Sequence, residues 1–160
     1  MKVFLGIGTN LGNRESNLKE VVKEIEEHIG QVLQTSSVYE TAPWGFTAEN
    51  DFLNMVLKVE TVNSPSGLLK RVLMIESMLG RIRNEEQYTS RIIDIDILLY
   101  GDQVIDEKNL RIPHPLMHER NFVLVPLCEI APELVHPVKG KSIRVLLEDC
   151  IDKTKILKLT

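Results

Sequence analysis

Residues 91–101 constrain this chain more than any other part of its sequence. Apolar residues stand there at every second position: Ile93, Ile95, Ile97 and Leu99. This is the period of a β-strand with one face on a core, so Asp94 and Asp96 share the opposite face. Two carboxylates about 7 Å apart at the backbone repel by roughly 2 kcal/mol at an effective dielectric near 20. Either a hard divalent cation such as Mg²⁺ offsets this repulsion, or the face is simply solvated.

The length, composition and net charge of the chain are those of an ordinary globular protein. The chain has 160 residues, of which 43% are hydrophobic and 26% charged, so a single domain over residues 1–160 can bury a sizeable core. The net charge of −4 gives no sign of a nucleic-acid or membrane partner. The two cysteines form no C-x-x-C pair, and no signal-peptide pattern or run of about 18 apolar residues occurs. We expect a cytoplasmic protein and, since nothing indicates an obligate interface, a monomer.

Apolar periodicity and turn residues predict the secondary structure. Strands are expected at 2–8, 31–39, 51–61 and along the alternating stretch. Helices are expected at about 14–29, capped by Asn13, and from the N-cap Ser64 to Gly80. The order strand, helix, strand, strand, helix, strand is the β-α-β-β-α-β unit of ferredoxin-like folds, which have an antiparallel sheet. We expect a further strand at 122–127 and a short helix at 142–150. These would extend the α+β core into an α/β/α sandwich.

Several residues before the aspartate pair suit a flat ligand. Phe52 and Asn54 are neighbours on the less apolar face of the 51–61 strand, where they could stack on a heterocycle and hydrogen-bond to its edge. Taken alone, however, such a pair is more often explained by ordinary cross-strand packing. The loop at 41–50 carries Trp44 and Phe46, so it either folds back on the core or receives a ligand. Glu76 lies in the last turn of a predicted helix, where the dipole disfavours an acid, which suggests a separate role.

Cationic side chains flank the aspartate pair on both sides. Arg81, Arg83 and Arg91 precede it, and Arg111, His114 and Arg120 follow it. A cation at the aspartates with guanidinium groups around it is what a polyphosphate needs. Phosphoryl transfer depends on positioning and electrostatics, so the lack of a Ser-His-Asp constellation is no objection. The residues alone therefore predict a magnesium-dependent nucleotide or phosphate enzyme.

Several motifs also occur in the order of one known family. They are GIGTNLGNR at 6–14, YETAPWG at 39–45, DFLN at 51–54, Glu76 with GRIR at 80–83, RIIDIDI at 91–97, IPH at 112–114 and RNF at 120–122. Together they resemble the 6-hydroxymethyl-7,8-dihydropterin pyrophosphokinases of folate biosynthesis over nearly the whole chain. The resemblance implies the ferredoxin-like α/β/α fold. It also implies transfer of the terminal diphosphate of ATP to the pterin hydroxymethyl group, releasing AMP, with two Mg²⁺ ions.

The resemblance assigns a role to individual residues. Asp94 and Asp96 match the metal ligands, and Arg81 and Arg91 match loop arginines that act in catalysis. The positions that match the pterin site are Thr41, Ala42, Trp44, Phe52, Asn54 and Phe122. Those that match the nucleotide site are Glu76, Arg83, Tyr88, Arg91, Ile97, Arg111, His114 and Arg120. The chain departs from the family at 88–91, where Tyr-Thr-Ser-Arg replaces the usual Trp-Gly-Pro-Arg, and at Pro115, where relatives have histidine or tyrosine.

Other interpretations of the same residues make different predictions. A plain kinase would release ADP, and a pterin aldolase would release an aldehyde, in place of AMP. A ferredoxin-like ligand sensor would bind nucleotide regardless of EDTA, because its aspartates would be surface groups. A platform for single-stranded RNA is disfavoured by the net charge of −4 and the aromatic content of 5%.

Overall fold

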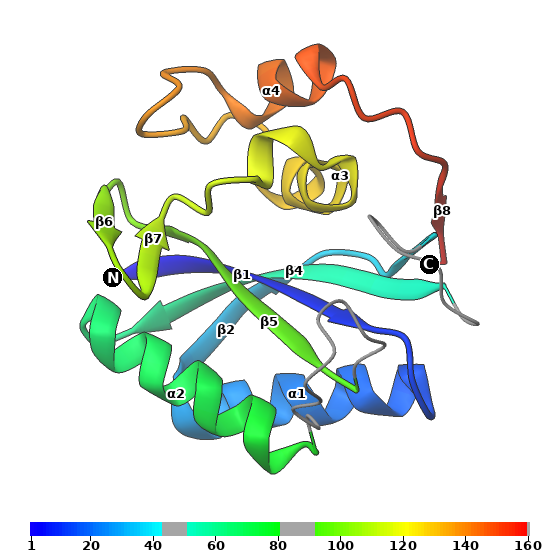
Figure 1. Cartoon of the computed structure of the whole chain (residues 1–160), viewed down its shortest axis with the longest axis vertical. Helices are drawn as coiled ribbons and strands as arrows, with labels where there is room; N and C mark the ends of the chain where they lie inside the picture. The colour runs from blue at the N-terminus through cyan, green and yellow to red at the C-terminus, as the bar shows by residue number, and fades with distance from the viewer. Residues whose placement is uncertain (43–50, 81–91, 160) are drawn as a thin grey trace.

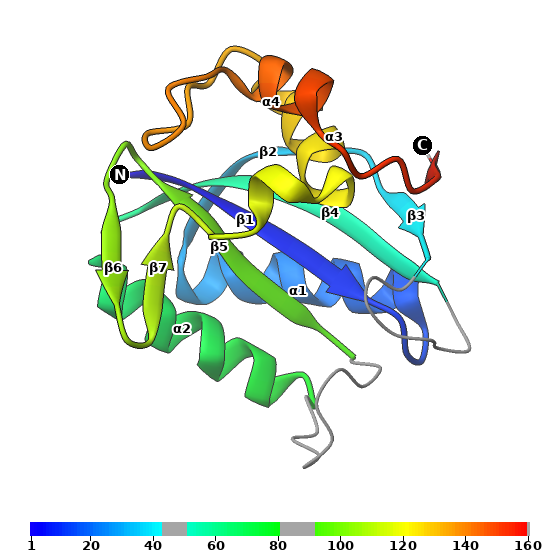
Figure 2. The same ribbon diagram turned by 45° about the horizontal axis from the view of Figure 1, so that its top comes forward.

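An antiparallel sheet forms the centre of the structure (Figures 1 and 2). The computed structural model describes residues 1–42, 51–80 and 92–159. The strands of the sheet are β1 (Lys2–Thr9), β2 (Gly30–Thr35), β3 (Tyr39–Thr41), β4 (Phe52–Thr61), β5 (Asp94–Tyr100) and β8 (Ile156–Lys158). They follow the order β5-β1-β4-β3-β8, and β2 pairs with β4 as well. A separate hairpin joins β6 (Ile105–Glu107) to β7 (Leu110–Ile112).

Helices lie on both faces of the sheet (Figure 1). One face is covered by α1 (Arg14–His28) and α2 (Pro65–Met78). Over the other face lies α3 (Asn121–Ile130), which follows the 3-10 helix η1 (Met117–Glu119) and contacts α4 (Ile143–Asp149). Each face has its own hydrophobic core, with Leu5 and Ile25 on the first side and Phe4 and Leu124 on the second. The prediction of a mixed helix-and-strand fold with an antiparallel sheet is confirmed.

The two long helices begin and end where the sequence predicts. Asn13 caps α1 because its side chain accepts a hydrogen bond from the Ser16 N–H at 3.0 Å, and Ser64 caps α2 by accepting from the Gly67 N–H at 3.1 Å. Beyond α2, Gly80 has a φ of +81°, a left-handed conformation that favours glycine. None of the helices in the described ranges is long and apolar enough to cross a bilayer.

The prediction of a strand at 122–127 is wrong. These residues belong to α3, whose Val123, Leu124 and Leu127 are buried in the second core. A short apolar run fits a buried strand and a buried helix equally, because the period is hidden when most sides are covered. Pro126 lies inside the helix. It lacks the N–H that either structure would use, so it does not distinguish them.

The predicted strand at 31–39 is interrupted at Ser36. The Ser36 N–H donates to the Val56 carbonyl at 2.9 Å, and the Ser36 hydroxyl accepts from the Val56 N–H at 2.8 Å. The chain resumes as β3, in which Thr41 pairs with Phe52 of β4. This pairing places the residues that end β3 beside the start of β4.

The alternation along β5 holds only as far as Ile97. Up to there, Ile93, Ile95 and Ile97 face the α1–α2 core as predicted. The register with β1 then shifts, because Leu5 pairs with Ile97 and Phe4 with Leu99. This β-bulge leaves Leu98 as the extra residue and turns Leu99 into the α3 core, opposite to the predicted face.

Candidate active site

One cavity wraps around β5 at the edge of the sheet. Its volume is about 650 Å³. Every described residue that the sequence analysis assigned to a site lines this cavity: Thr41, Ala42, Phe52, Asn54, Glu76, Asp94, Asp96, Ile97, Arg111, His114, Arg120 and Phe122. The other candidates, Trp44, Arg81, Arg83, Tyr88 and Arg91, lie outside the described residues. The structure therefore brings together residues from six separate stretches of the sequence.

Glycines form the floor between the strands that carry the polar groups. In the register of the sheet, Gly8 of β1 has Asn54 of β4 on one side and Asp94 of β5 on the other, and Gly6 pairs with Asp96. A Cβ atom at Gly8 would lie 3.3 Å from Oδ1 of Asn54 and 3.7 Å from the Phe52 ring. Gly8 therefore keeps open the space between the amide and the aspartate. The sequence analysis did not predict this role, although the Gly-Ile-Gly spacing at 6–8 carried the signal.

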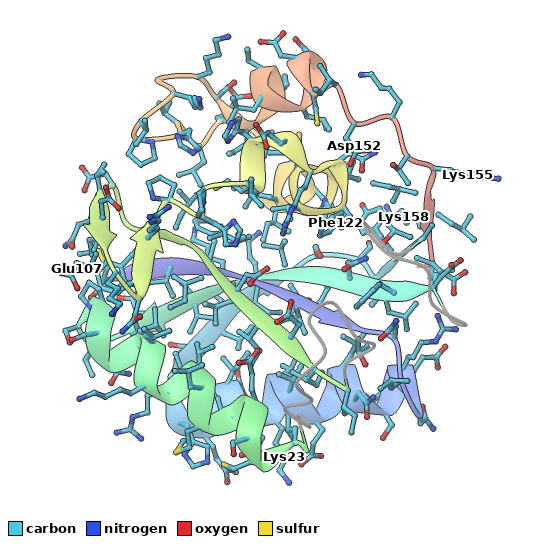
Figure 3. All side chains as sticks on the ribbon, in the orientation of Figure 1. Lys23, Glu107, Phe122, Asp152, Lys155 and Lys158 are labelled. Atoms are coloured by element: carbon cyan, nitrogen blue, oxygen red, sulfur yellow. The ribbon has the colours of Figure 1, made fainter. Side chains whose placement is uncertain are left out.

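The amide and aromatic groups occupy one side of the cavity. Asn54 is 7% exposed, and its Nδ2 donates a hydrogen bond to Oγ1 of Thr41 at 2.7 Å, which fixes the orientation of the amide. Phe52 neighbours Asn54 on β4, whereas Phe122 lies on α3 above the sheet (Figure 3). The Arg120 guanidinium lies 5.6 Å from the centre of the Phe122 ring, within cation–π range.

Glu76 holds the aspartate strand in place. Its side chain is 3% exposed, and Oε2 accepts a hydrogen bond from the Ile95 N–H at 2.9 Å. β5 lies at the edge of the sheet, and no strand within residues 1–42, 51–80 and 92–159 pairs with its outer side. The carboxylate of Glu76 on α2 takes the place of such a strand. This bond to β5 explains why Glu76 stands in the last turn of the helix, where the helix dipole disfavours an acid.

His114 faces the aspartates from beyond β7. Its Nδ1 accepts a hydrogen bond from the Leu116 N–H at 3.2 Å, and its Nε2 lies 4.0 Å from Oδ1 of Asp96. Burial, and then the positive charge of Arg120, lower the pKa of His114 to about 4, although Asp94 acts in the opposite direction. The ring is therefore neutral near pH 7. Because Nδ1 is an acceptor, the proton of the neutral ring is on Nε2.

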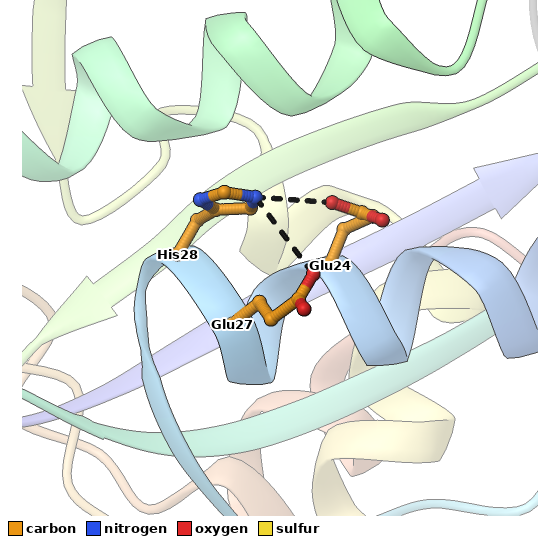
Figure 4. A group of neighbouring side chains, drawn as sticks. All are labelled: Glu24, Glu27 and His28. Carbon is orange, nitrogen blue, oxygen red and sulfur yellow. Dashed lines mark ion pairs between the residues drawn. The ribbon is translucent and has the colours of Figure 1, made fainter.

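The aspartate pair suits a hard cation. Asp94 and Asp96 stand on one face of β5, both half-buried at the cavity, and offer the carboxylate oxygens that Mg²⁺ prefers. A different donor group lies on α1, where Nε2 of His28 is 3.2 Å from Glu24 and 4.0 Å from Glu27 (Figure 4). None of the three residues of this second group lines the cavity. The group is explained by the pairing of His28 with Glu24, one helical turn before it, and by the adjacent Glu27.

An apolar wall of the cavity was missed by sequence reasoning. Leu69, Val72 and Leu73 of α2 line it, and so does Leu110 of β7. The sequence analysis treated the three α2 residues as part of the apolar run of a helix and assigned them no role in a site. Leu73 is 42% exposed, which only the structure reveals, so no sequence signal distinguished this wall from the helix core.

A protein-family model and several curated relatives match the chain. The model of 7,8-dihydro-6-hydroxymethylpterin-pyrophosphokinase (HPPK) matches residues 4–132. A 2-amino-4-hydroxy-6-hydroxymethyldihydropteridine pyrophosphokinase of Aquifex aeolicus is 40% identical over 142 residues, which cover 89% of this chain and 88% of that protein. Proteins of the same name from Methylorubrum extorquens and Bacillus subtilis are 43% and 39% identical, over 91% and 82% of this chain and 91% and 78% of their own length.

Solved structures share the fold. The HPPK-DHPS protein of Plasmodium falciparum, solved with SDX-DHP, has a TM-score of 0.76 and 22% sequence identity over 92% of this chain. The chain spans only 43% of the length of that solved chain. The wild-type structure of the same protein gives a TM-score of 0.75 at 20% identity, over 92% of this chain and 44% of that one. At this identity the likeness concerns the arrangement of helices and strands.

Proposed function

Because the chain belongs to the 7,8-dihydro-6-hydroxymethylpterin-pyrophosphokinase family, we propose that it transfers the terminal diphosphate of ATP to the hydroxymethyl group of 6-hydroxymethyl-7,8-dihydropterin and releases AMP. Membership makes the chain a pyrophosphokinase of folate synthesis, an ATP-dependent diphosphotransferase. One observation supports the detailed reaction: a single cavity has aromatic and amide side chains on one side and aspartate, histidine and arginine side chains on the other.

The pterin would occupy the aromatic side. Its flat ring would stack between Phe52 of β4 and Phe122 of α3, and Asn54 would read the ring edge. The bond from Asn54 to Thr41 supports this assignment, because it orients the amide before any ligand arrives. Backbone groups of Thr41, Ala42 and Trp44 would complete the recognition.

The triphosphate would lie over the aspartates. Asp94 and Asp96 would hold two Mg²⁺ ions. When bound, the ions would neutralise the negative charge that develops on the phosphate oxygens during the transfer. The Arg120 guanidinium would bind phosphate from the α3 side, and the neutral His114 would donate a hydrogen bond from Nε2. Arg81 and Arg91 would supply further positive charge. We assign no essential general base, because positioning and electrostatics account for most of such a transfer.

The nucleotide would extend toward α2 and β7. The sites proposed for it are Glu76, Arg83, Tyr88, Arg91, Ile97, Arg111, His114 and Arg120. The apolar wall of Leu69, Val72 and Leu73 suits the flat face of a base, and the exposed Arg111 lies at the mouth of the cavity. Glu76 would act there mainly by holding β5.

We also propose a ferredoxin-like β-α-β-β-α-β core within an α/β/α sandwich, in one domain over 1–160. The antiparallel order β5-β1-β4 with β2 beside β4 supports this, as do the helices on both faces. The cytoplasmic location and the monomeric state stay predictions of the sequence analysis.

Product analysis tests the proposed reaction. The protein is incubated with ATP, Mg²⁺ and 6-hydroxymethyl-7,8-dihydropterin, and nucleotides and pterins are separated. We expect AMP and pterin diphosphate in equal amounts, and neither product when EDTA is added or the pterin is omitted. Formation of ADP or of an aldehyde would overturn the proposal. It would also be overturned if the protein bound nucleotide equally well with and without EDTA and formed no product.

A further inference from the structure

The first turn of α3 takes its cap from a distant part of the chain. Arg120 stands at the N-cap position and makes no side-chain capping bond. The N–H of Asn121, at the start of the helix, instead donates to Oδ2 of Asp152 at 3.2 Å. A carboxylate at this position satisfies one of the free backbone donors and interacts favourably with the helix dipole. Asp152 therefore performs the task that the local Asn13 performs in α1 and the local Ser64 in α2.

The cap is held in a defined orientation. The other oxygen of Asp152, Oδ1, accepts from the backbone N–H of Thr154 at 3.0 Å and from its hydroxyl at 2.6 Å. The carbonyl of Thr154 in turn accepts from Nδ2 of Asn121 at 2.7 Å. Asn121 is thus bonded to the segment 152–154 through both its backbone and its side chain. Figure 3 shows Asp152 close to α3.

Asn121 is flanked by two residues that line the cavity. Arg120 precedes it and Phe122 follows it, and both belong to the unit that the cap fixes. The buried Val123, Leu124 and Leu127 hold the rest of α3 on the sheet without help from the cap. Loss of the cap would therefore loosen the first turn rather than detach the helix, because capping effects are confined to the first turn.

The capping segment also reaches the opposite side of the cavity. After Thr154 the chain forms β8, which pairs with β3 so that Ile156 faces Thr41. Thr41 in turn accepts the bond from Asn54. The segment thus joins the α3 side, with Phe122, to the strand side, with Asn54.

We propose that Asp152 is a positioning residue for the ligand site. By capping α3 it fixes Arg120 and Phe122 relative to the strands that carry Phe52 and Asn54. The ligands named here rest on the proposed function, whereas the capping itself does not. No contact of Asp152 with the cavity is required, since it acts through Asn121.

The test compares Asp152→Ala with Asp152→Asn and Asp149→Ala. The asparagine keeps an acceptor oxygen for the Asn121 N–H. Asp149 is exposed and pairs with Lys141 at 3.2 Å, so it serves as a matched control in the same part of the chain. Hydrogen exchange of peptides covering 119–124 measures the cap directly. We expect faster exchange there in Asp152→Ala, a smaller increase in Asp152→Asn, which keeps only one of the two acceptor oxygens, and no change in Asp149→Ala.

Ligand binding then measures the consequence. We expect Asp152→Ala to weaken pterin binding about 3- to 30-fold, the range of a lost cap, with a larger rise in KM than fall in kcat. Unchanged exchange and unchanged pterin binding in Asp152→Ala would overturn the proposal. That outcome would say nothing against the proposed reaction, which the wild-type protein tests by forming AMP. If the wild type forms no AMP, the proposed function fails, and the exchange experiment still decides the cap.

A milder variant guards against misfolding. Thr154→Val removes the hydroxyl that holds Oδ1 of Asp152 and leaves the carboxylate in place. Because Thr154 is exposed, this variant should fold. We expect an effect in the same direction as Asp152→Ala but smaller, and no change at all in either measurement would count against the proposal.

Discussion

Oε2 of Glu76 accepts a hydrogen bond from the backbone N–H of Ile95 at 2.9 Å, which ties α2 to the residue between the two aspartates. The carboxylate is 3% exposed, and the N–H belongs to an edge strand. The position of Asp94 and Asp96 thus depends on a side chain that stands on a different element. This relationship separates the structural role of Glu76 from any contact with a ligand.

Replacing Glu76 should test that separation. Glu76→Ala leaves the Ile95 N–H without its acceptor, which should lower the free energy of unfolding by about 1–3 kcal/mol. Glu76→Gln keeps an amide oxygen at the same place and should lose less. Urea denaturation followed by circular dichroism gives the comparison, with the exposed Ser77→Ala as control. Equal stability of Glu76→Ala and Ser77→Ala would show that the bond contributes nothing.

The aspartate pair should be essential for turnover. Asp94→Asn and Asp96→Asn each remove one charge from the proposed Mg²⁺ site, and we expect AMP formation to fall by about 100-fold or more. Asp102→Asn, at the exposed turn after β5, should leave the rate unchanged. The rate is measured over a range of Mg²⁺ concentrations. Normal turnover in either β5 variant would rule out the metal assignment of that residue.

The glycine floor should control pterin binding. In Gly8→Ala the new methyl group meets Oδ1 of Asn54 at 3.3 Å, so the amide must move. We expect pterin affinity to fall about tenfold, in line with one misplaced methyl group in a pocket. Gly6→Ala meets only the flexible end of Leu98 at 3.4 Å and should cost less. Titration with the pterin measures both, and the reverse order of effects would contradict this account of the floor.

A buried histidine should make stability depend on pH. His136 is 3% exposed, and its Nδ1 accepts from the N–H groups of Val138 and Lys139 at 3.2 and 3.0 Å. Burial, followed by the charges of His118 and Lys139, lowers the pKa of His136 below its ordinary value of 6.5. The unfolded chain therefore binds a proton that the folded chain does not, so stability falls as the pH drops below 6.5.

Asparagine at this position separates His136 from the other groups. In His136→Asn the amide oxygen can still accept the two backbone bonds, but nothing titrates there. We expect a smaller loss of unfolding free energy between pH 7.5 and 5.5 than in the wild type, measured by urea denaturation. Some loss should remain, since the lowered pKa of His114 acts in the same direction. Identical losses in the two proteins would exclude His136 as a cause.

Local signals made most of the first hundred residues predictable. Asn13 and Ser64 mark helix starts by chemistry that acts within one turn, and the structure confirms both caps. The shared face of Asp94 and Asp96 followed from the period of a strand alone. Those residues assigned through family resemblance that the structure describes line one cavity, and their roles stay predictions.

The features that could not be predicted depend on partners far away in the chain. Whether 122–127 forms a strand or a helix is decided by what covers it, and an apolar run does not report its cover. The bulge at Leu98 exists only relative to the register of β1. Gly8 matters because of Asn54 and Asp94, and Asp152 because of Asn121, and no local pattern connects these pairs.

The bulge in β5 makes the two faces of the sheet interdependent. Ile97 contributes to one core and the adjacent Leu98 and Leu99 to the other, so both layers share the strand that presents the aspartates. Melting of either layer would release the same strand. A destabilising substitution in the core on the side remote from the ligands, for example beneath α1, should therefore abolish ligand binding at the temperature at which that layer melts. No partly folded form should still bind the ligands.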